Sequence, residues 1–139
     1  MGLDEQIQQT TDVLELRNLV ARLAQLADSG ELDDYIQLFT EDASWESTTH
    51  GTRRGHADIL QGARERRADG VSGPGAHTLH VITTTSIQLA GDTATGQSYF
   101  LFYVNADKTP ELSIMGVYND TYQRTPQGWK LARRVISSA

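Results

Sequence analysis

At 139 residues, with a formal net charge of -6, no Cys and 38% hydrophobic residues, the chain is expected to form one domain (1–139) with room for one small-molecule pocket. The acidic balance argues against a nucleic-acid or anionic-membrane surface, because phosphates require clustered Lys and Arg. Arg64, Arg66 and Arg67 form the densest basic run, and Glu65 and Asp69 beside them indicate a solvated helix face. The lack of Cys excludes disulfides, thiolate metal ligands and a cysteine nucleophile.

Nothing in the sequence indicates membrane insertion or export. No segment is apolar for long enough to span a bilayer, and residues 1–6 lack the basic and apolar regions of a signal peptide. We therefore expect a cytoplasmic protein.

Helices are predicted in the first half of the chain. Apolar residues recur at three- and four-residue spacing from Asp12 onward, which predicts a helix that Gly30 ends. Asp12 and Glu15 resemble a capping box at its start. A second short helix has one apolar stripe, made of Leu32, Tyr35, Ile36 and Phe39. Residues 40–42 are predicted to turn into a short strand through Trp45, and a third helix follows Gly55.

The second half reads as antiparallel sheet, so the domain is α+β rather than built from βαβ units. The glycine-rich segment 69–75 precedes the sheet and is interpreted as a surface connection, with a lid over a pocket as the alternative. Strands are expected at residues 77–89, 93–105, 111–125 and 129–137.

Alternation along the strands assigns the two faces of this sheet. Phe100, Phe102, Ile114, Gly116 and Tyr118 are expected on the cavity side, where Gly116 leaves a gap in the wall. The opposite face is also apolar, so we expect it to form a homodimer. It contains Tyr99, Leu101, Tyr103, Met115 and Val117.

Two titratable residues stand out as a candidate acid and base. Asp28 lies at the edge of the first helix's apolar stripe, and His80 opens the first strand among apolar neighbours. An imidazole held by a carboxylate can act as a general base near neutral pH, which suits elimination, dehydration or isomerisation. The structural alternatives are a turn residue that caps local amides and a core histidine with one backbone hydrogen bond. Asp28 near a helix C-terminus also opposes the helix dipole, so it needs a compensating partner.

No metal site is expected. His77 and His80 are three apart on a strand, so their side chains point to opposite faces and form a poor chelate. His50 and His56 lie in a polar, glycine-bordered stretch and are interpreted as surface residues.

Four segments together resemble the SnoaL-like branch of the nuclear transport factor 2-like superfamily over nearly the whole chain. They are residues 26–33 (LADSGELD), 38–45 (LFTEDASW), the strand with His80, and 119–122 with 128–131 (NDTY and GWKL). This resemblance implies a cone: a curved antiparallel (mixed) sheet wrapped by three N-terminal helices around a pocket, usually as a dimer.

The resemblance also carries residue roles. Asp28 and His80 match the Asp-His dyad of the scytalone dehydratase and hexachlorocyclohexane dehydrochlorinase type, and Trp45 matches a pocket tryptophan of the latter. Fungal dehydratases have a tyrosine where this chain has Ala27, and a second histidine near the Phe100/Phe102 pair. Ketosteroid isomerases need a tyrosine at Leu23 and an acid at Ser47, so that activity is not expected.

We therefore expect a lyase or isomerase that needs no cofactor or metal and acts on a small, largely apolar, cyclic substrate. Asp28 and His80 would be catalytic. The predicted pocket residues are Leu23, Trp45, Phe100, Phe102, Ile114, Gly116 and Tyr118. The alternative is a non-catalytic small-molecule-binding or accessory protein that uses the same cone as a receptacle. Whether Asp28 and His80 come within hydrogen-bond reach discriminates between the two hypotheses.

Overall fold

The computed structural model describes residues 1–139 and contains three helices and six strands. In chain order the elements are α1 (Leu3–Ser29), α2 (Leu32–Gln37), β1 (Phe39–Ser47), β2 (Gly51–Arg54), α3 (Gly55–Ala68), β3 (Leu79–Ala90), β4 (Thr93–Val104), β5 (Glu111–Thr125) and β6 (Gly128–Ser138). Helices precede the main strands, as predicted.

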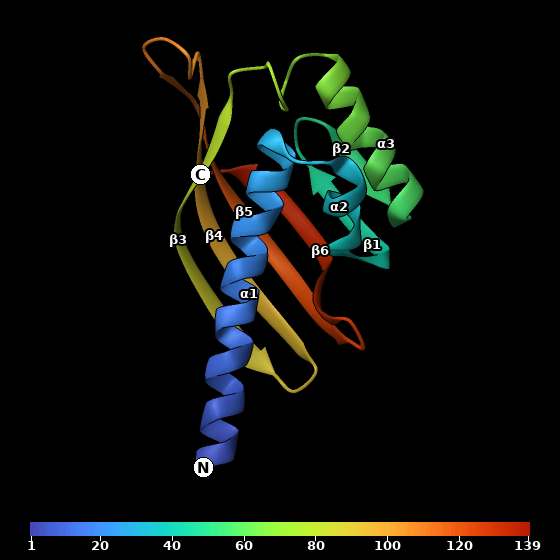
Figure 1. Ribbon diagram of the computed structural model, residues 1–139, viewed down its shortest axis with the longest axis vertical. Coiled ribbons are helices and arrows are strands. Elements are labelled where there is room, and N and C mark those ends of the chain that lie inside the picture. The colour runs from blue at the N-terminus through green and yellow to red at the C-terminus, as the bar shows by residue number, and fades with distance from the viewer.

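One curved sheet forms the framework, in the order β2-β1-β6-β5-β4-β3 (Figure 1). Neighbouring strands are antiparallel except β1 and β6, which run parallel, so the sheet is mixed. All three helices lie on one face of the sheet (Figure 1). The predicted α+β arrangement, a curved mixed sheet with three helices on one face, is confirmed.

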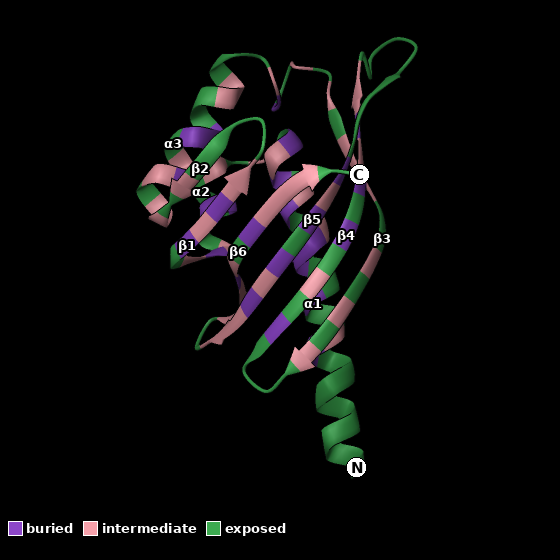
Figure 2. Cartoon of the chain, turned by 180° about the vertical axis from the view of Figure 1, so that it is seen from behind, coloured by how far each residue is buried: buried purple, intermediate pink, exposed green.

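The core lies between α1 and the concave face of the sheet. Leu16, Leu23 and Phe39 are fully or almost fully buried there. The alternation that places every second residue of a strand inward explains why Tyr122 and Leu131 meet them from β5 and β6. The opposite sheet face carries no helix, and in Figure 2 exposed residues alternate with buried ones along β4 and β5.

The start of α1 corrects one prediction. The helix begins at Leu3 rather than Asp12, and its first turns are exposed and extend past the sheet (Figure 2). Asp12 is therefore not a capping residue but a buried carboxylate inside the helix. It accepts hydrogen bonds from both terminal nitrogens of Arg124, at 2.9 and 2.8 Å, and from the Trp129 indole at 3.1 Å. Glu15 accepts the Trp129 backbone N–H at 2.6 Å, so both residues fix α1 to the β5–β6 hairpin.

The segment between α2 and α3 also differs from the prediction. Residues 40–42 belong to β1 and form no turn, and Gly51–Arg54 is a short strand that the sequence did not indicate. The register of β1 against β6 is irregular between Phe39 and Ser44. No helix is both long and apolar enough to cross a membrane.

Candidate active site

The end of α1 places Asp28. Gly30 leaves the helical conformation, and its N–H still bonds the Leu26 carbonyl at 3.0 Å. A side chain at Gly30 would overlap that of Leu26, so the close turn requires glycine. Asp28 thus lies in the last turn of α1, 8% exposed, with its carboxylate facing β3.

Asp28 binds His80 through two hydrogen bonds. Its Oδ1 lies 2.6 Å from the imidazole Nδ1, and its Oδ2 accepts the backbone N–H of His80 at 2.9 Å. A carboxylate only accepts hydrogen bonds, so this pairing places hydrogen on Nδ1, and in the neutral ring Nε2 then carries the lone pair. The two-point contact fixes both the position and the ring tautomer of His80.

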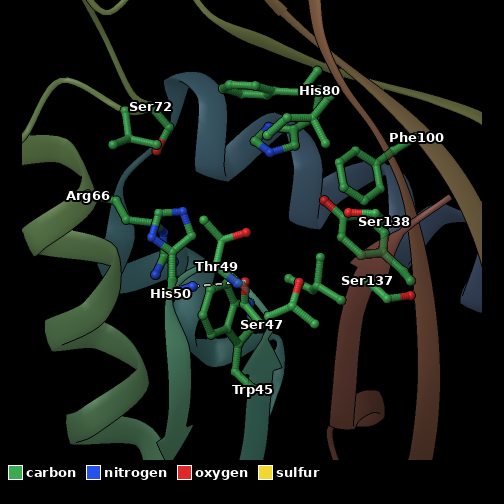
Figure 3. A pocket seen from close by; sticks show the side chains of 16 residues that line it. Trp45, Ser47, Thr49, His50, Arg66, Ser72, His80, Phe100, Ser137 and Ser138 are labelled. Carbon is green, nitrogen blue, oxygen red and sulfur yellow. Dashed lines mark hydrogen bonds between the residues drawn. The ribbon is translucent and has the colours of Figure 1, made fainter.

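The His80 side chain is 20% exposed, so it is less buried than the sequence suggested. Its ring packs on Phe102, with centroids 4.6 Å apart, in register with that residue across β3 and β4. The ring borders the cavity shown in Figure 3, where it lies above Trp45 and beside Phe100. The imidazole therefore connects a buried carboxylate with an accessible space.

Arg67 satisfies the carbonyl end of α1. Its guanidinium donates to the carbonyls of Leu26 at 2.9 Å and Gly30 at 2.7 Å. A cation at a helix C-terminus offsets the negative end of the dipole, which is the compensation that Asp28 needs there. The interpretation of Arg67 as a solvated residue is therefore wrong.

The cavity consists of two adjoining chambers between the helices and the sheet. The outer chamber encloses about 660 Å³ and the inner one about 530 Å³, open solvent at their mouths included in both values. They share six lining residues: Trp45, Arg66, Ser72, His80, Tyr118 and Ile136.

Most predicted pocket residues line one of these chambers. The outer chamber is bordered by Trp45, Phe100, Phe102, Ile114 and Tyr118. Leu23 lines the inner chamber. Whether they bind a substrate stays a prediction.

Gly116 is the exception. A side chain there would overlap the Phe100 ring, so the glycine makes room for Phe100 and opens no space for a ligand. Phe100 in turn stacks on Tyr118, with centroids 4.3 Å apart and planes at 17°. The predicted gap in the wall is thus filled by a neighbouring aromatic side chain.

Arg134, which lines the inner chamber, belongs to a buried ion pair. Arg134 donates two hydrogen bonds of 2.9 Å to Asp120, and the Tyr122 hydroxyl donates to Asp120 at 2.8 Å. The Arg134 guanidinium lies 3.8 Å from the Tyr118 ring centre. Burial raises the pKa of Tyr118 well above its ordinary value, so the hydroxyl stays protonated. It has no partner within the protein and can donate a hydrogen bond to a ligand.

The cavity wall is more polar than the sequence indicated. Beyond the predicted residues, the outer chamber is lined by Ser47, Thr48, Thr49, His50, Arg66, Ser72, Ser137 and Ser138. Arg66 was assigned to a solvated face, but it is half-buried and lines both chambers. Helical spacing contained the signal, because Arg66 lies seven and three residues after the buried Ile59 and Ala63. Ser72 shows that the 69–75 segment forms part of the pocket wall.

The other histidines have different surroundings. His50 is exposed, as predicted, and it also borders the outer chamber. Desolvation of its ring and the nearby charge of Arg66 lower its pKa. His56 is partly buried, with its ring Nε2 2.8 Å from the Phe39 carbonyl. No three His, Cys, Asp or Glu side chains gather in a way that could hold a metal ion.

Comparison with known proteins places this geometry among relatives. The family model described as "SnoaL-like domain" matches residues 8–135. An uncharacterized protein of Mycobacterium tuberculosis is 28% identical over 132 residues, which cover 93% of this chain and 86% of the relative.

Solved structures agree. An NTF2-like protein with a cystatin-like fold from Novosphingobium aromaticivorans superposes with a TM-score of 0.82 at 28% identity, covering 98% of this chain and 87% of that one. A second protein of that organism, provisionally named an aromatic ring hydroxylase, has a TM-score of 0.77 at 25% identity over 93% and 90% of the two chains. Neither description mentions a dehydratase or a dehydrochlorinase.

Proposed function

The chain belongs to the SnoaL-like domain family, and we propose that it is a cofactor-independent lyase or isomerase of a small, largely apolar, cyclic substrate. One observation carries the proposal. Asp28 holds Nδ1 of His80 at 2.6 Å, and the imidazole borders an apolar cavity. This is the arrangement that a general base requires, because the carboxylate fixes the tautomer and offsets the charge of the imidazolium.

The proposed step is a proton transfer from carbon. His80 Nε2 takes a proton from a carbon next to a carbonyl group, and the C–H electron pair moves into the substrate. In a lyase it forms a C=C bond while a hydroxide or halide leaves the adjacent carbon. In an isomerase it forms an enolate that is protonated again at another carbon. Both outcomes balance without an external electron carrier.

Tyr118 is the proposed partner of the substrate carbonyl. Its neutral hydroxyl can donate to the oxygen on which negative charge develops, and it is 5% exposed at the boundary of the two chambers. Hydrogen bonds to developing charge in such dry surroundings lower the barrier more than they would in water.

The Asp28 and His80 pair supports a likeness to the scytalone dehydratase and hexachlorocyclohexane dehydrochlorinase type. Ala27 and Phe102, where the fungal dehydratases have a tyrosine and a second histidine, speak against scytalone itself as substrate. The hydroxylase name given provisionally to one relative is in keeping with a ring-shaped substrate.

Proton NMR in D₂O tests the proposal. Cyclic ketones with a hydroxyl or chloride at the β carbon, each with and without a ring carboxylate, are incubated with the protein. We expect loss of the α-proton signal and release of the leaving group. His80→Ala should slow this by about a hundred- to ten-thousand-fold. His77→Ala is the matched control, because His77 is three residues away and its side chain is 55% exposed.

Two results would decide against catalysis. Equal rates for the wild type and the His80→Ala variant on a substrate that is turned over would make the dyad structural. Tight binding of the panel without any exchange or elimination would favour the alternative, a receptacle that holds a small molecule unchanged.

A further inference from the structure

Arg66 is a cation at the cavity without an anionic partner. It lies in the last turn of α3 and lines both chambers. Its guanidinium rests 4.3 Å from the centre of the Trp45 ring. No hydrogen bond or ion pair joins it to any other side chain, and the neighbouring Glu65 binds Arg53.

The other two arginines of the cavity wall have partners. Arg67 donates to main-chain carbonyls at the end of α1, and Arg134 pairs with Asp120. Arg66 therefore differs from both.

The lining of both chambers includes three arginines and no Asp or Glu. Asp120 balances the charge of Arg134, and main-chain carbonyls accept from Arg67. Arg66 is therefore the uncompensated cation of this lining. Burial lowers the pKa of Arg66, since a charged group loses hydration there. A bound anion would restore the lost interactions of the guanidinium through charge-assisted hydrogen bonds.

We propose that Arg66 binds a carboxylate of the substrate, so that the substrate class is a small cyclic compound with an acid group. The proposal rests on the function proposed above and specifies its substrate. Stacking on Trp45 is then the resting position of the guanidinium, and the Ser72 hydroxyl, which has no partner within the protein, is a second donor beside it.

The geometry assigns separate tasks to the two ends of such a substrate. Figure 3 shows Arg66 and His50 on one wall, Phe100 on the facing wall and His80 above. An acid group at Arg66 would leave the ring between Trp45 and Phe100, with a carbon near the imidazole. The carboxylate does not acidify that carbon. It orients the substrate, and remote binding of this kind contributes to the rate through positioning.

Binding of a matched pair of probes tests the proposal without turnover. Cyclohexanecarboxylate and cyclohexanecarboxamide have nearly the same shape and differ in charge, and neither absorbs where tryptophan does. Tryptophan fluorescence reports on Trp45, and Trp45→Phe shows which part of the signal comes from it rather than from Trp129. We expect the carboxylate to bind at least about tenfold more tightly than the amide.

The variants identify the residue responsible. Arg66→Gln should remove the preference, and Arg66→Lys should retain part of it. Arg64→Gln is the matched control, because it changes the net charge equally on the same helix while its side chain is 58% exposed and lies outside the cavity. His80→Gln should keep the preference, so failed catalysis and failed anion binding remain distinguishable.

Three outcomes would overturn the proposal. They are equal affinity of the wild type for the two probes, an unchanged preference in Arg66→Gln, and no effect of the carboxylate on Trp45 at millimolar concentration.

Discussion

Helix α1 contains two buried carboxylates, Asp12 and Asp28, that differ in their number of hydrogen-bond partners. Asp12 accepts hydrogen bonds from Gln8, Arg124 and the Trp129 indole. Asp28 has one partner, His80, whose second ring nitrogen is free at a cavity. Both carboxylates are similarly buried, at 5% and 8% exposure. Burial alone therefore does not distinguish a stabilising carboxylate from a catalytic one. The distinguishing feature is whether the partner of the carboxylate has a free hydrogen-bonding atom at the cavity.

Exchanging each acid for its amide gives the largest contrast. Asp28→Asn should slow turnover by about a hundred- to ten-thousand-fold. The amide oxygen can still accept the His80 backbone N–H, but the NH₂ group must then face Nδ1. That forces Nδ1 to accept and places the proton on Nε2, where a base needs a lone pair. The rate constant on any substrate that is turned over measures this, and a near wild-type rate would contradict it.

Asp12→Asn should do the reverse. It leaves the half-buried Arg124 and the indole with a weaker acceptor, so the free energy of unfolding should fall by about 1 to 3 kcal/mol. Turnover at a temperature where the variant is folded should stay unchanged. Urea unfolding followed by far-UV circular dichroism measures the first quantity. A stable variant with reduced turnover would remove the distinction between the two acids.

These two acids also show what the sequence could reveal. The α+β order, the range of β5 and the pairing of Asp28 with His80 followed from periodicity and residue type. The sequence suggests Asp12 as a cap because residues 3–11 are exposed and, apart from Leu3 and Ile7, polar, so no apolar stripe marks the true start of α1. Its partner Arg124 lies 112 residues away, and local pattern contains no information on such a contact.

The site was harder to predict than the fold. Arg66 and Arg67 look alike in a basic run, and only packing of α3 separates the cavity residue from the one that caps α1. Gly116 was read as an opening because the sequence does not show that the Phe100 ring occupies the space.

Apolar side chains without a partner also indicate a binding surface, as the free ring nitrogen of His80 does. Tyr99 and Met115 are 48% and 56% exposed on the sheet face that no helix covers (Figure 2). We propose that a second copy covers this face, with Leu101, Tyr103 and Val117 contributing. Light scattering at micromolar concentration should give twice the mass of the chain. Met115→Lys should raise the dimer dissociation constant at least about tenfold. A wild-type monomer would refute this interface.

The smallest expected effect is a pH dependence that belongs to Asp12. The hydrogen bonds from Arg124 lower the pKa of Asp12 from 3.8 to about 2. A group whose pKa is depressed by folding stabilises the folded state at pH values above its unfolded pKa, and this contribution disappears as the pH falls toward the folded pKa. About 1 kcal/mol of it should be lost by pH 3.

Other carboxylates titrate in the same range, so the wild type alone cannot isolate this contribution. The amide that the Asp12→Asn variant carries does not titrate, and the difference in unfolding free energy between the two proteins cancels the shared groups. That difference should be constant from pH 7 to 5 and should shrink by about 1 kcal/mol between pH 5 and 3. Urea unfolding at each pH gives it. A constant difference down to pH 3 would mean that the Arg124 and Trp129 contacts do not stabilise the ionised form of Asp12. The larger number of hydrogen bonds to Asp12 would then not make it more stabilising than Asp28.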